Sequence, residues 1–213
     1  MVLGLSAWLV PPPTVASKLT SQIMSLRPPS SSLPKAPSSA SSFPRFDPHI
    51  TLLTVPSSTP LSEIRDAIPT DQVKIPVRFK SADVGQKYFM SVFVTVHQGS
   101  DDGAKELDEL RNKLKERFGE GRVPPVSHVS LYYIDDPDAD LREAVLEELK
   151  NQGRIVPQGN DGDSSGGEVA LDCTEGSERG KDLINGFEGT EIWLALCDGP
   201  VETWQIKEKI LLK

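Results

Sequence analysis

Two short motifs in the sequence place a histidine two positions before a hydroxyl residue. His49 precedes Thr51 in this way, and His128 precedes Ser130. Side chains two positions apart on a β-strand point to the same face, so each motif would present an imidazole beside a hydroxyl. The apolar residue inside each motif points the other way and can anchor its strand in a core. Two such strands would bring both imidazoles to one cleft.

Two imidazoles and two hydroxyls, without a pair of carboxylates, suit the hydrolysis of a phosphate diester. Imidazole titrates close to neutral pH, so one ring can take a proton from water while its protonated partner gives one to the leaving oxygen. Each transfer contributes about 10²- to 10⁴-fold to a rate. We therefore predict that His49 and His128 are catalytic, and that Thr51 and Ser130 donate hydrogen bonds to the non-bridging phosphate oxygens.

The remaining histidine and the two cysteines fit this chemistry less well. His97 has no hydroxyl residue two positions later within such a motif, so we expect a structural or surface role for it. A metal held by the two motif histidines would need a third ligand, which His97 could in principle provide. We expect neither a metal nor an organic cofactor. Cys173 and Cys197 lack CxxC spacing and are expected to take no part, and the sequence leaves open whether they pair.

The spacing of apolar residues predicts a chain of interleaved strands and helices. A helix over 14–26 would begin at Thr14 as its N-cap, and Pro76 indicates that the strand around it is an edge strand. Because strands and helices alternate without a regular rhythm, the pattern favours an α+β fold with a mainly antiparallel sheet. The predicted strands cover 1–10, 49–55, 74–80, 87–97, 126–134, 190–197 and 202–212, and the further helices cover 58–69, 103–118 and 138–150.

Two segments lack this regular pattern. Residues 27–44 are rich in serine and proline and are predicted to form a flexible surface loop. Residues 151–185 are rich in glycine and are predicted to form a loop or insertion, with one strand at 168–173. We expect residues 1–213 to form a single domain of two lobes.

Composition limits the partners and the compartment. The formal net charge is −8 and no basic cluster is present, which argues against a long nucleic acid and favours a small anionic ligand. The apolar residues 1–10 lack the basic residues and cleavage site of a signal peptide, and no segment reaches the ~20 apolar residues that span a bilayer. Few cysteines suit a reducing compartment. We expect an intracellular, cytoplasmic monomer without a membrane partner.

The two motifs and their separation resemble those of the 2H phosphoesterase superfamily. The resemblance is strongest to fungal and plant cyclic phosphodiesterases and covers most of the chain except 27–44 and 151–185. It implies a bilobal α+β fold, with two mainly antiparallel sheets flanked by helices around a central cleft. The stretches that carry it are "SAWLVPP" at 6–12, "PHITLL" at 48–53, "YFMSVFVTV" at 88–96 and "PVSHVSLYY" at 125–133.

The resemblance also implies an activity. It is metal-independent hydrolysis of 2',3'-cyclic nucleotides to 2'-phosphates, and of ADP-ribose 1'',2''-cyclic phosphate, a product of tRNA splicing, to ADP-ribose 1''-phosphate. By this resemblance His128 would activate water and His49 would protonate the leaving oxygen. The alternatives are a phosphodiesterase or ligase that processes RNA ends, and a non-catalytic nucleotide-binding module.

Two tyrosines are candidates for the phosphate site. Members of the superfamily often carry a tyrosine five positions after the second histidine, which corresponds to Tyr133. Strand alternation instead places Tyr132 on the face of His128. Both stay candidates at this point, and Tyr88, Phe89 and Trp193 are candidates for stacking on a nucleotide base.

Overall fold

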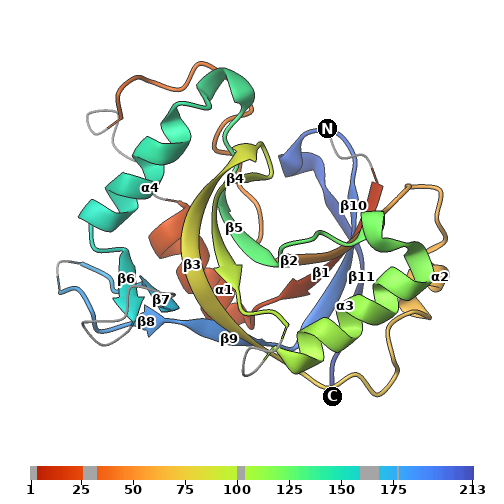
Figure 1. Cartoon of the computed structure of the whole chain (residues 1–213). Coiled ribbons are helices and arrows are strands. Elements are labelled where there is room, and N and C mark those ends of the chain that lie inside the picture. The colour runs from red at the N-terminus through yellow and green to blue at the C-terminus, as the bar shows by residue number, and fades with distance from the viewer. Residues whose placement is uncertain (1–3, 26–32, 100–103, 159–167, 177) are drawn as a thin grey trace.

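The computed structural model describes residues 4–25, 33–99, 104–158, 168–176 and 178–213 (Figure 1). Within these residues the chain has an α+β fold with two antiparallel sheets, which confirms the predicted fold class. No helix in the described ranges is long and apolar enough to cross a membrane.

The first part of the chain supplies two neighbouring strands. The helix between them begins after Pro12, whose side chain forms no capping hydrogen bond, so the prediction of Thr14 as the N-cap is wrong. Pro13 takes the first helical position, where its fixed φ and missing N–H cost little. The elements are β1 (Gly4–Val10), α1 (Pro13–Leu19), the π-helical turn η1 (Thr20–Met24), β2 (Ile50–Val55) and α2 (Leu61–Arg65).

The middle of the chain forms a hairpin, a helix, a third strand and another helix. The longer helix ends at Gly119, whose φ of 91° favours glycine. The elements are β3 (Ile75–Lys87), β4 (Met90–Val96), α3 (Lys105–Phe118), the 3-10 turn η2 (Glu120–Arg122), β5 (His128–Tyr132), the 3-10 turn η3 (Asp136–Asp138) and α4 (Leu141–Asn151).

The last part of the chain contains more strands than the sequence predicted. We expected one strand within 151–185, and the structure has three, while residues 159–167 and 177 of this segment lie outside the described residues. These strands are two to five residues long, too short for alternation to be recognised among glycines. The elements are β6 (Ile155–Gln158), β7 (Glu168–Asp172), β8 (Leu183–Ile184), β9 (Gly186–Gly189), β10 (Glu191–Cys197), the 3-10 turn η4 (Val201–Thr203) and β11 (Gln205–Leu211).

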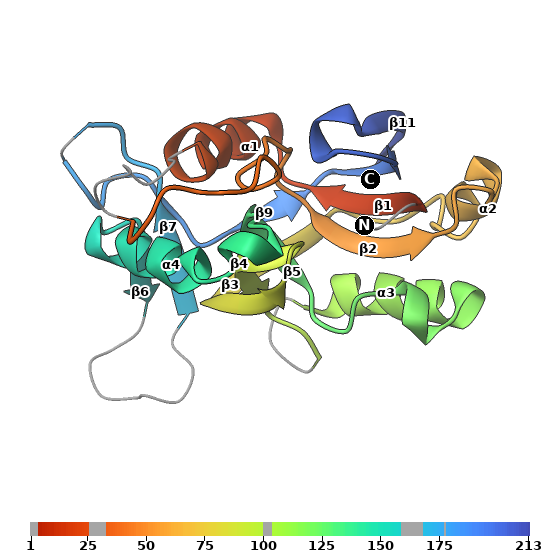
Figure 2. The same ribbon diagram turned by 90° about the horizontal axis from the view of Figure 1, so that it is seen from above.

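The larger sheet has eight strands in the order β11-β10-β1-β2-β5-β4-β3-β9, and the smaller has the order β6-β7-β8. The small sheet and α4 lie at one end of the molecule and α2 and α3 at the other, as both views show (Figures 1 and 2). The prediction that the strand around Pro76 is an edge strand is wrong, because β9 pairs with Ile75–Arg78 on the outer side. The short strand β9, which follows the glycine-rich segment, is the edge instead.

The two faces of the large sheet have different surroundings. On β1, Leu5, Ala7 and Leu9 alternate into the main core, to which α3 and α4 contribute their buried apolar side chains. Trp8 and Val10 point to the opposite face, where they pack with Ala195 and Cys197. The main core therefore lies on one face of the sheet, and the other face is left to form a cavity.

The large sheet divides into two halves of four strands. They meet between β2 and β5, where Ile50 pairs with Val129, the one register pair between these fully described strands. Both side chains are fully buried. This narrow junction fixes how the first half, which carries His49, is placed against the second, which carries His128.

The small sheet depends on a buried carboxylate, and this generates a first prediction. Asp172 is fully buried and accepts hydrogen bonds from the backbone N–H groups of Thr174 (2.9 Å) and Gly180 (2.6 Å). Asp172→Ala should lower the free energy of unfolding by about 1–3 kcal/mol, because buried donors lose their acceptor. Urea denaturation checks this against Glu175→Ala, an exposed control on the same loop. Equal midpoints for the two variants would contradict it.

Candidate active site

The register of the junction brings both motifs to one face. Ile50 and Val129 point into the core, so the residues on either side of them point to the opposite face. His49, Thr51, His128 and Ser130 all line one cavity of about 270 Å³. The structure thus brings together the four residues that the sequence singled out.

Each imidazole is held in the same way by its own strand. His49 Nδ1 lies 2.7 Å from the carbonyl oxygen of Asp47, and His128 Nδ1 lies 3.0 Å from that of Val126. A carbonyl oxygen only accepts, so Nδ1 carries the hydrogen in the neutral rings, a tautomer inferred from its partner. Nε2 of each ring is then the nitrogen left to exchange protons with a ligand.

Each motif is followed by a β-bulge at the same position. Between β1 and β2 the register passes from Thr51 to Leu53, and between β5 and β4 it passes from Ser130 to Tyr132. Leu52 and Leu131 are thus extra residues, and the side-chain alternation changes after them. The fifth residue after each histidine, Thr54 or Tyr133, therefore joins the cavity lining.

The second bulge decides between the two tyrosines. Tyr132 is buried in the main core and its hydroxyl donates to the carbonyl oxygen of Ile23, so the placement expected from strict alternation is wrong. Tyr133 lines the cavity and stacks on Phe46 with ring centroids 4.0 Å apart. Burial raises the pKa of Tyr133 far above its usual range, so the hydroxyl stays protonated and can donate.

Aromatic rings enclose both histidines. Trp8 stacks on His49 at 4.0 Å, and Phe93 meets His128 edge-on at 5.3 Å. Trp8 and Phe93 hold equivalent register positions, opposite Thr51 and Ser130 respectively. The rest of the lining is mostly apolar, with Ser6, Lys87, Phe89, Met90, Pro124, Pro125, Cys197 and Trp204.

The aromatic residues expected to bind a base are only partly in place. Phe89 lines the cavity, with its ring 5.7 Å from that of Trp204. Tyr88 directs its hydroxyl to the carbonyl oxygen of Ser41, and Trp193 donates to Glu191, outside the lining. Sequence reasoning missed Trp8 and Trp204. The position of Trp8 in an alternating strand could have indicated its face, whereas Trp204 follows a 3-10 turn and has no such signal.

Burial favours the neutral form of both imidazoles. It lowers the pKa of His49 from 6.5 to about 4, against the opposing effect of the Asp47 carbonyl and with a smaller contribution from the charge of His128. Burial also lowers the pKa of His128, where the carbonyls of Val126 and Phe89 oppose the shift and the charge of Arg111 adds to it. Both rings can therefore accept a proton at neutral pH.

The two hydroxyls differ in their present partners. Ser130 Oγ donates to the carbonyl oxygen of Phe89 at 2.9 Å, whereas the Thr51 hydroxyl has no hydrogen bond to any described residue. A phosphate oxygen could take the Thr51 donor at once. To accept a hydrogen bond from Ser130, a phosphate oxygen would have to displace the carbonyl oxygen of Phe89.

A buried arginine binds the segment that precedes the second motif. Arg111 on α3 is 2% exposed and donates to the carbonyl oxygen of Pro124 at 2.6 Å and to the hydroxyl of Ser127. It thereby ties to α3 the segment that leads into His128 and forms one wall of the cavity. Its role could not be read from the sequence, where it is one of many charged residues on an amphipathic helix.

The structure keeps His97 away from the cavity. Its Nε2 lies 3.3 Å from Glu168 on the small sheet. Among the described residues no group of three or more histidine, cysteine or acidic side chains could hold a metal ion. Cys173 and Cys197 are both buried and free, and Cys197 lies in the cavity wall.

Comparison with known proteins places this geometry in a family. The sequence model of the family described as cyclic phosphodiesterase-like protein matches residues 1–212. The chain belongs to the cyclic phosphodiesterase-like family. Membership of this family supports phosphodiesterase activity in general, as an enzyme of the hydrolase class.

Other comparisons add little to the family assignment. No curated protein matches the chain. Among solved structures, the crystal structure of TT0787 of Thermus thermophilus is similar over 99% of this chain and 98% of its own, at 16% identity and a TM-score of 0.44.

The bulge in β5 predicts different outcomes for the two tyrosines of this cyclic phosphodiesterase-like protein. Tyr132→Phe should lower the free energy of unfolding by about 1–3 kcal/mol, because the carbonyl of Ile23 loses a buried donor, and should leave kcat unchanged. Tyr133→Phe should lower kcat/KM roughly 10²-fold if its hydroxyl acts as an oxyanion donor, with little change in stability. Thermal melts and phosphodiesterase kinetics on both variants check this. The opposite pattern would mean that the tyrosines had been assigned to the wrong faces.

Proposed function

We propose that this protein is a metal-independent cyclic phosphodiesterase. Its substrates are 2',3'-cyclic nucleotides, opened to 2'-phosphates, and ADP-ribose 1'',2''-cyclic phosphate, opened to ADP-ribose 1''-phosphate. The observation that carries the proposal is the pair of matching motifs on one cavity, each with Nδ1 fixed by a main-chain carbonyl and Nε2 left for proton transfer. Family membership supports the reaction class.

The reaction can be followed atom by atom. Water loses a proton to one imidazole and attacks phosphorus, the bond between phosphorus and O3' breaks, and O3' takes a proton from the other imidazole. The product keeps its phosphate on O2'. Thr51, Ser130 and Tyr133 would donate hydrogen bonds to the non-bridging oxygens, where negative charge accumulates. No carboxylate lines the cavity to repel the phosphate, among the residues that the structure describes.

The two proton-transfer roles can be divided between the histidines in two ways. The resemblance gives His128 as the base and His49 as the acid. In the ligand-free site burial lowers the pKa of His49 to about 4, so the role of acid that the resemblance gives it requires the bound phosphate to raise this pKa. An anion within hydrogen-bonding distance favours the charged form of an imidazole, so such a shift is physically reasonable.

The size and lining of the cavity favour a small ligand. A volume of about 270 Å³ lies near the lower end of small-molecule sites, which span ~300–1,000 Å³. Phe89 and Trp204 offer aromatic surface on which a nucleotide base could stack. The net charge of −8 argues against a polymeric RNA substrate, which relies on many phosphate contacts. We propose a small cyclic-phosphate nucleotide or the ADP-ribose derivative as the ligand.

The decisive experiment is to incubate the protein with 2',3'-cyclic nucleotides and EDTA and to identify the phosphate isomer formed. We expect the 2'-phosphate, with no loss of rate in EDTA. His49→Ala and His128→Ala should each remove most of kcat, and the double variant should be little worse than the weaker single one, because the two rings act as a unit. His97→Ala is the matched control and should retain full turnover.

The same variants can assign the two roles. An aryl phosphodiester with a p-nitrophenolate leaving group needs little help from a general acid. The histidine whose alanine variant is much less impaired on the aryl ester than on the cyclic nucleotide is therefore the acid. Near-normal turnover of His49→Ala on cyclic nucleotides, or strong inhibition by EDTA, would overturn the proposed function.

The pH dependence of kcat/KM follows from the state of the free site. One imidazole must be neutral and the other charged, so the profile should be bell-shaped. Because burial lowers both pKa values below 6.5, we expect the acid limb near pH 4, from His49, and the alkaline limb below pH 6.5, from His128. The profile of kcat should lie at higher pH, because bound phosphate stabilises imidazolium. Initial rates in buffers that run from well below to well above these limbs check this, and a kcat/KM profile centred above neutral pH would contradict it.

A further inference from the structure

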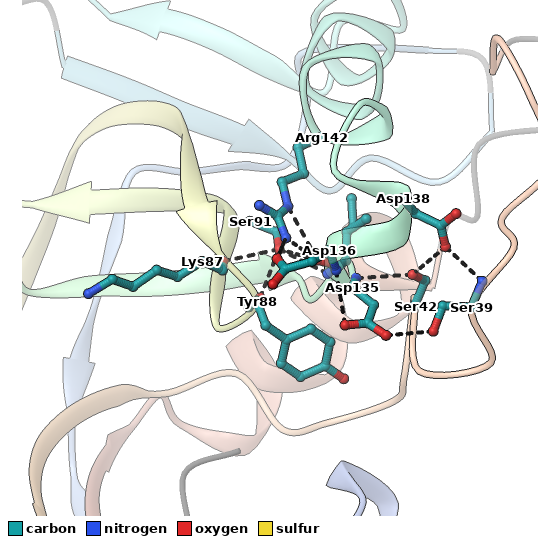
Figure 3. Close-up of polar contacts among 10 residues, drawn as sticks. Ser39, Ser42, Lys87, Tyr88, Ser91, Asp135, Asp136, Asp138 and Arg142 are labelled. Carbon is teal, nitrogen blue, oxygen red and sulfur yellow. Dashed lines mark hydrogen bonds and ion pairs between the residues drawn. The ribbon is translucent and has the colours of Figure 1, made fainter.

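A segment rich in serine lies between Asp138 in one half of the molecule and His49 in the other. Asp138, at the end of η3, is fully buried. Its carboxylate accepts hydrogen bonds from Ser38 N (2.8 Å), Ser38 Oγ (2.6 Å), Ser39 N (3.0 Å) and Ser42 Oγ (2.7 Å). Burial opposes the charge, but these four donors together hold the pKa of Asp138 well below its usual range. Figure 3 shows part of this cluster.

Further contacts fix the same segment to the end of β5. Ser39 Oγ donates to Asp135 at 2.6 Å, and Ser42 Oγ accepts the backbone N–H of Asp135 at 3.0 Å. The backbone N–H of Phe43 donates to the carbonyl oxygen of Tyr133 at 2.8 Å. We call residues 38–47 the serine strap. Its first residues are thus anchored to the half of the sheet that carries His128.

The other end of the serine strap reaches His49. Phe46 stacks on Tyr133 at 4.0 Å and meets the His49 ring edge-on at 6.4 Å. The carbonyl oxygen of Asp47 is the acceptor that fixes His49 Nδ1. Two of the groups that surround the His49 ring therefore belong to a segment held by Asp138, in the other half of the molecule.

We propose that Asp138 is a positioning residue for the catalytic pair, acting through the serine strap. The strap holds the Asp47 carbonyl against His49 and the Phe46 ring over the gap between His49 and Tyr133. It thereby sets the distance between the two imidazoles and keeps water from the first of them. The catalytic part of this proposal rests on the proposed function.

The serine strap adds a further connection across the junction of the large sheet. The two halves share the register pair Ile50 and Val129 and one core, to which α3 also contributes. The serine strap joins them again at a distance from that pair, through the charge-assisted hydrogen bonds of Asp138. A tilt of one half against the other would change the separation of the two Nε2 atoms, on which in-line attack depends.

The structure offers a test that does not depend on activity. The variants are Asp138→Asn, whose amide N–H₂ replaces an acceptor, and Phe46→Ala, which removes the cover but keeps the anchor. Glu143→Gln, a change of the same charge on the exposed side of α4, is the matched control. The readout is the titration of the three imidazoles by NMR, in which His49 is assigned by comparison with His97→Ala and His128→Ala.

Both variants should raise the pKa of His49 from about 4 towards 6.5, because water gains access to the ring. Loss of a carboxylate charge would by itself lower this pKa, so a rise cannot come from the charge change. The titratable groups that share the cavity with His49 are His128, Tyr133, Cys197 and Lys87, and none is altered. On cyclic nucleotides, kcat should fall on the order of ten- to a hundredfold, more than KM changes, since a misplacement of about 1 Å costs that much.

The outcomes separate the strap from the proposed function. If the wild-type protein hydrolyses no cyclic phosphate, the proposed function fails, and the NMR titration still tests the strap. A folded Asp138→Asn whose His49 titrates as in the wild type, and whose kcat equals that of Glu143→Gln, would overturn the positioning role. If Asp138→Asn does not fold, Phe46→Ala tests the strap instead. An unchanged His49 titration and an unchanged kcat in Phe46→Ala would then overturn the positioning role.

Discussion

The site depends on one pair of buried aliphatic residues. Ile50 and Val129 face each other where the two halves of the large sheet meet, and their side chains are fully buried. Because strand residues alternate, this register directs the flanking histidines and hydroxyls to the opposite face. A slip of one residue on either strand would send its histidine into the core. The hydrophobic effect thus specifies the polar site, by fixing which face each side chain takes.

The two halves repeat the same local plan around this pair. In each, a main-chain carbonyl two residues before the histidine fixes Nδ1, an aromatic residue of the adjacent strand covers the ring, and a bulge follows the hydroxyl residue. The halves differ in the burial of the histidine and in its partners. His49 is 6% exposed and Trp8 stacks on its ring. His128 is less buried, and the charge of Arg111 contributes to lowering its pKa. Similar backbone geometry therefore supports two rings with different surroundings.

Much of this could be predicted from the sequence, because the evidence was local. The α+β class, most strands and helices, and the shared face of His49 and His128 followed from periodicity. Tyr132 was misplaced because a bulge depends on pairing with another strand, which alternation in one strand cannot reveal. The strands of the small sheet were hidden because each is too short to show a pattern. Asp138 and Arg111 could not be recognised from the sequence, since only the tertiary fold buries them.

The stacking of Trp8 on His49 has an optical consequence. A protonated imidazole in contact with an indole quenches its fluorescence more strongly than a neutral one does, and these rings lie 4.0 Å apart and nearly parallel. The emission of Trp8 therefore reports the charge of the ring beneath it. Any anion that enters the cavity and draws a proton onto that ring will dim this tryptophan. The protein thus carries its own spectroscopic indicator of the occupied site, without a label.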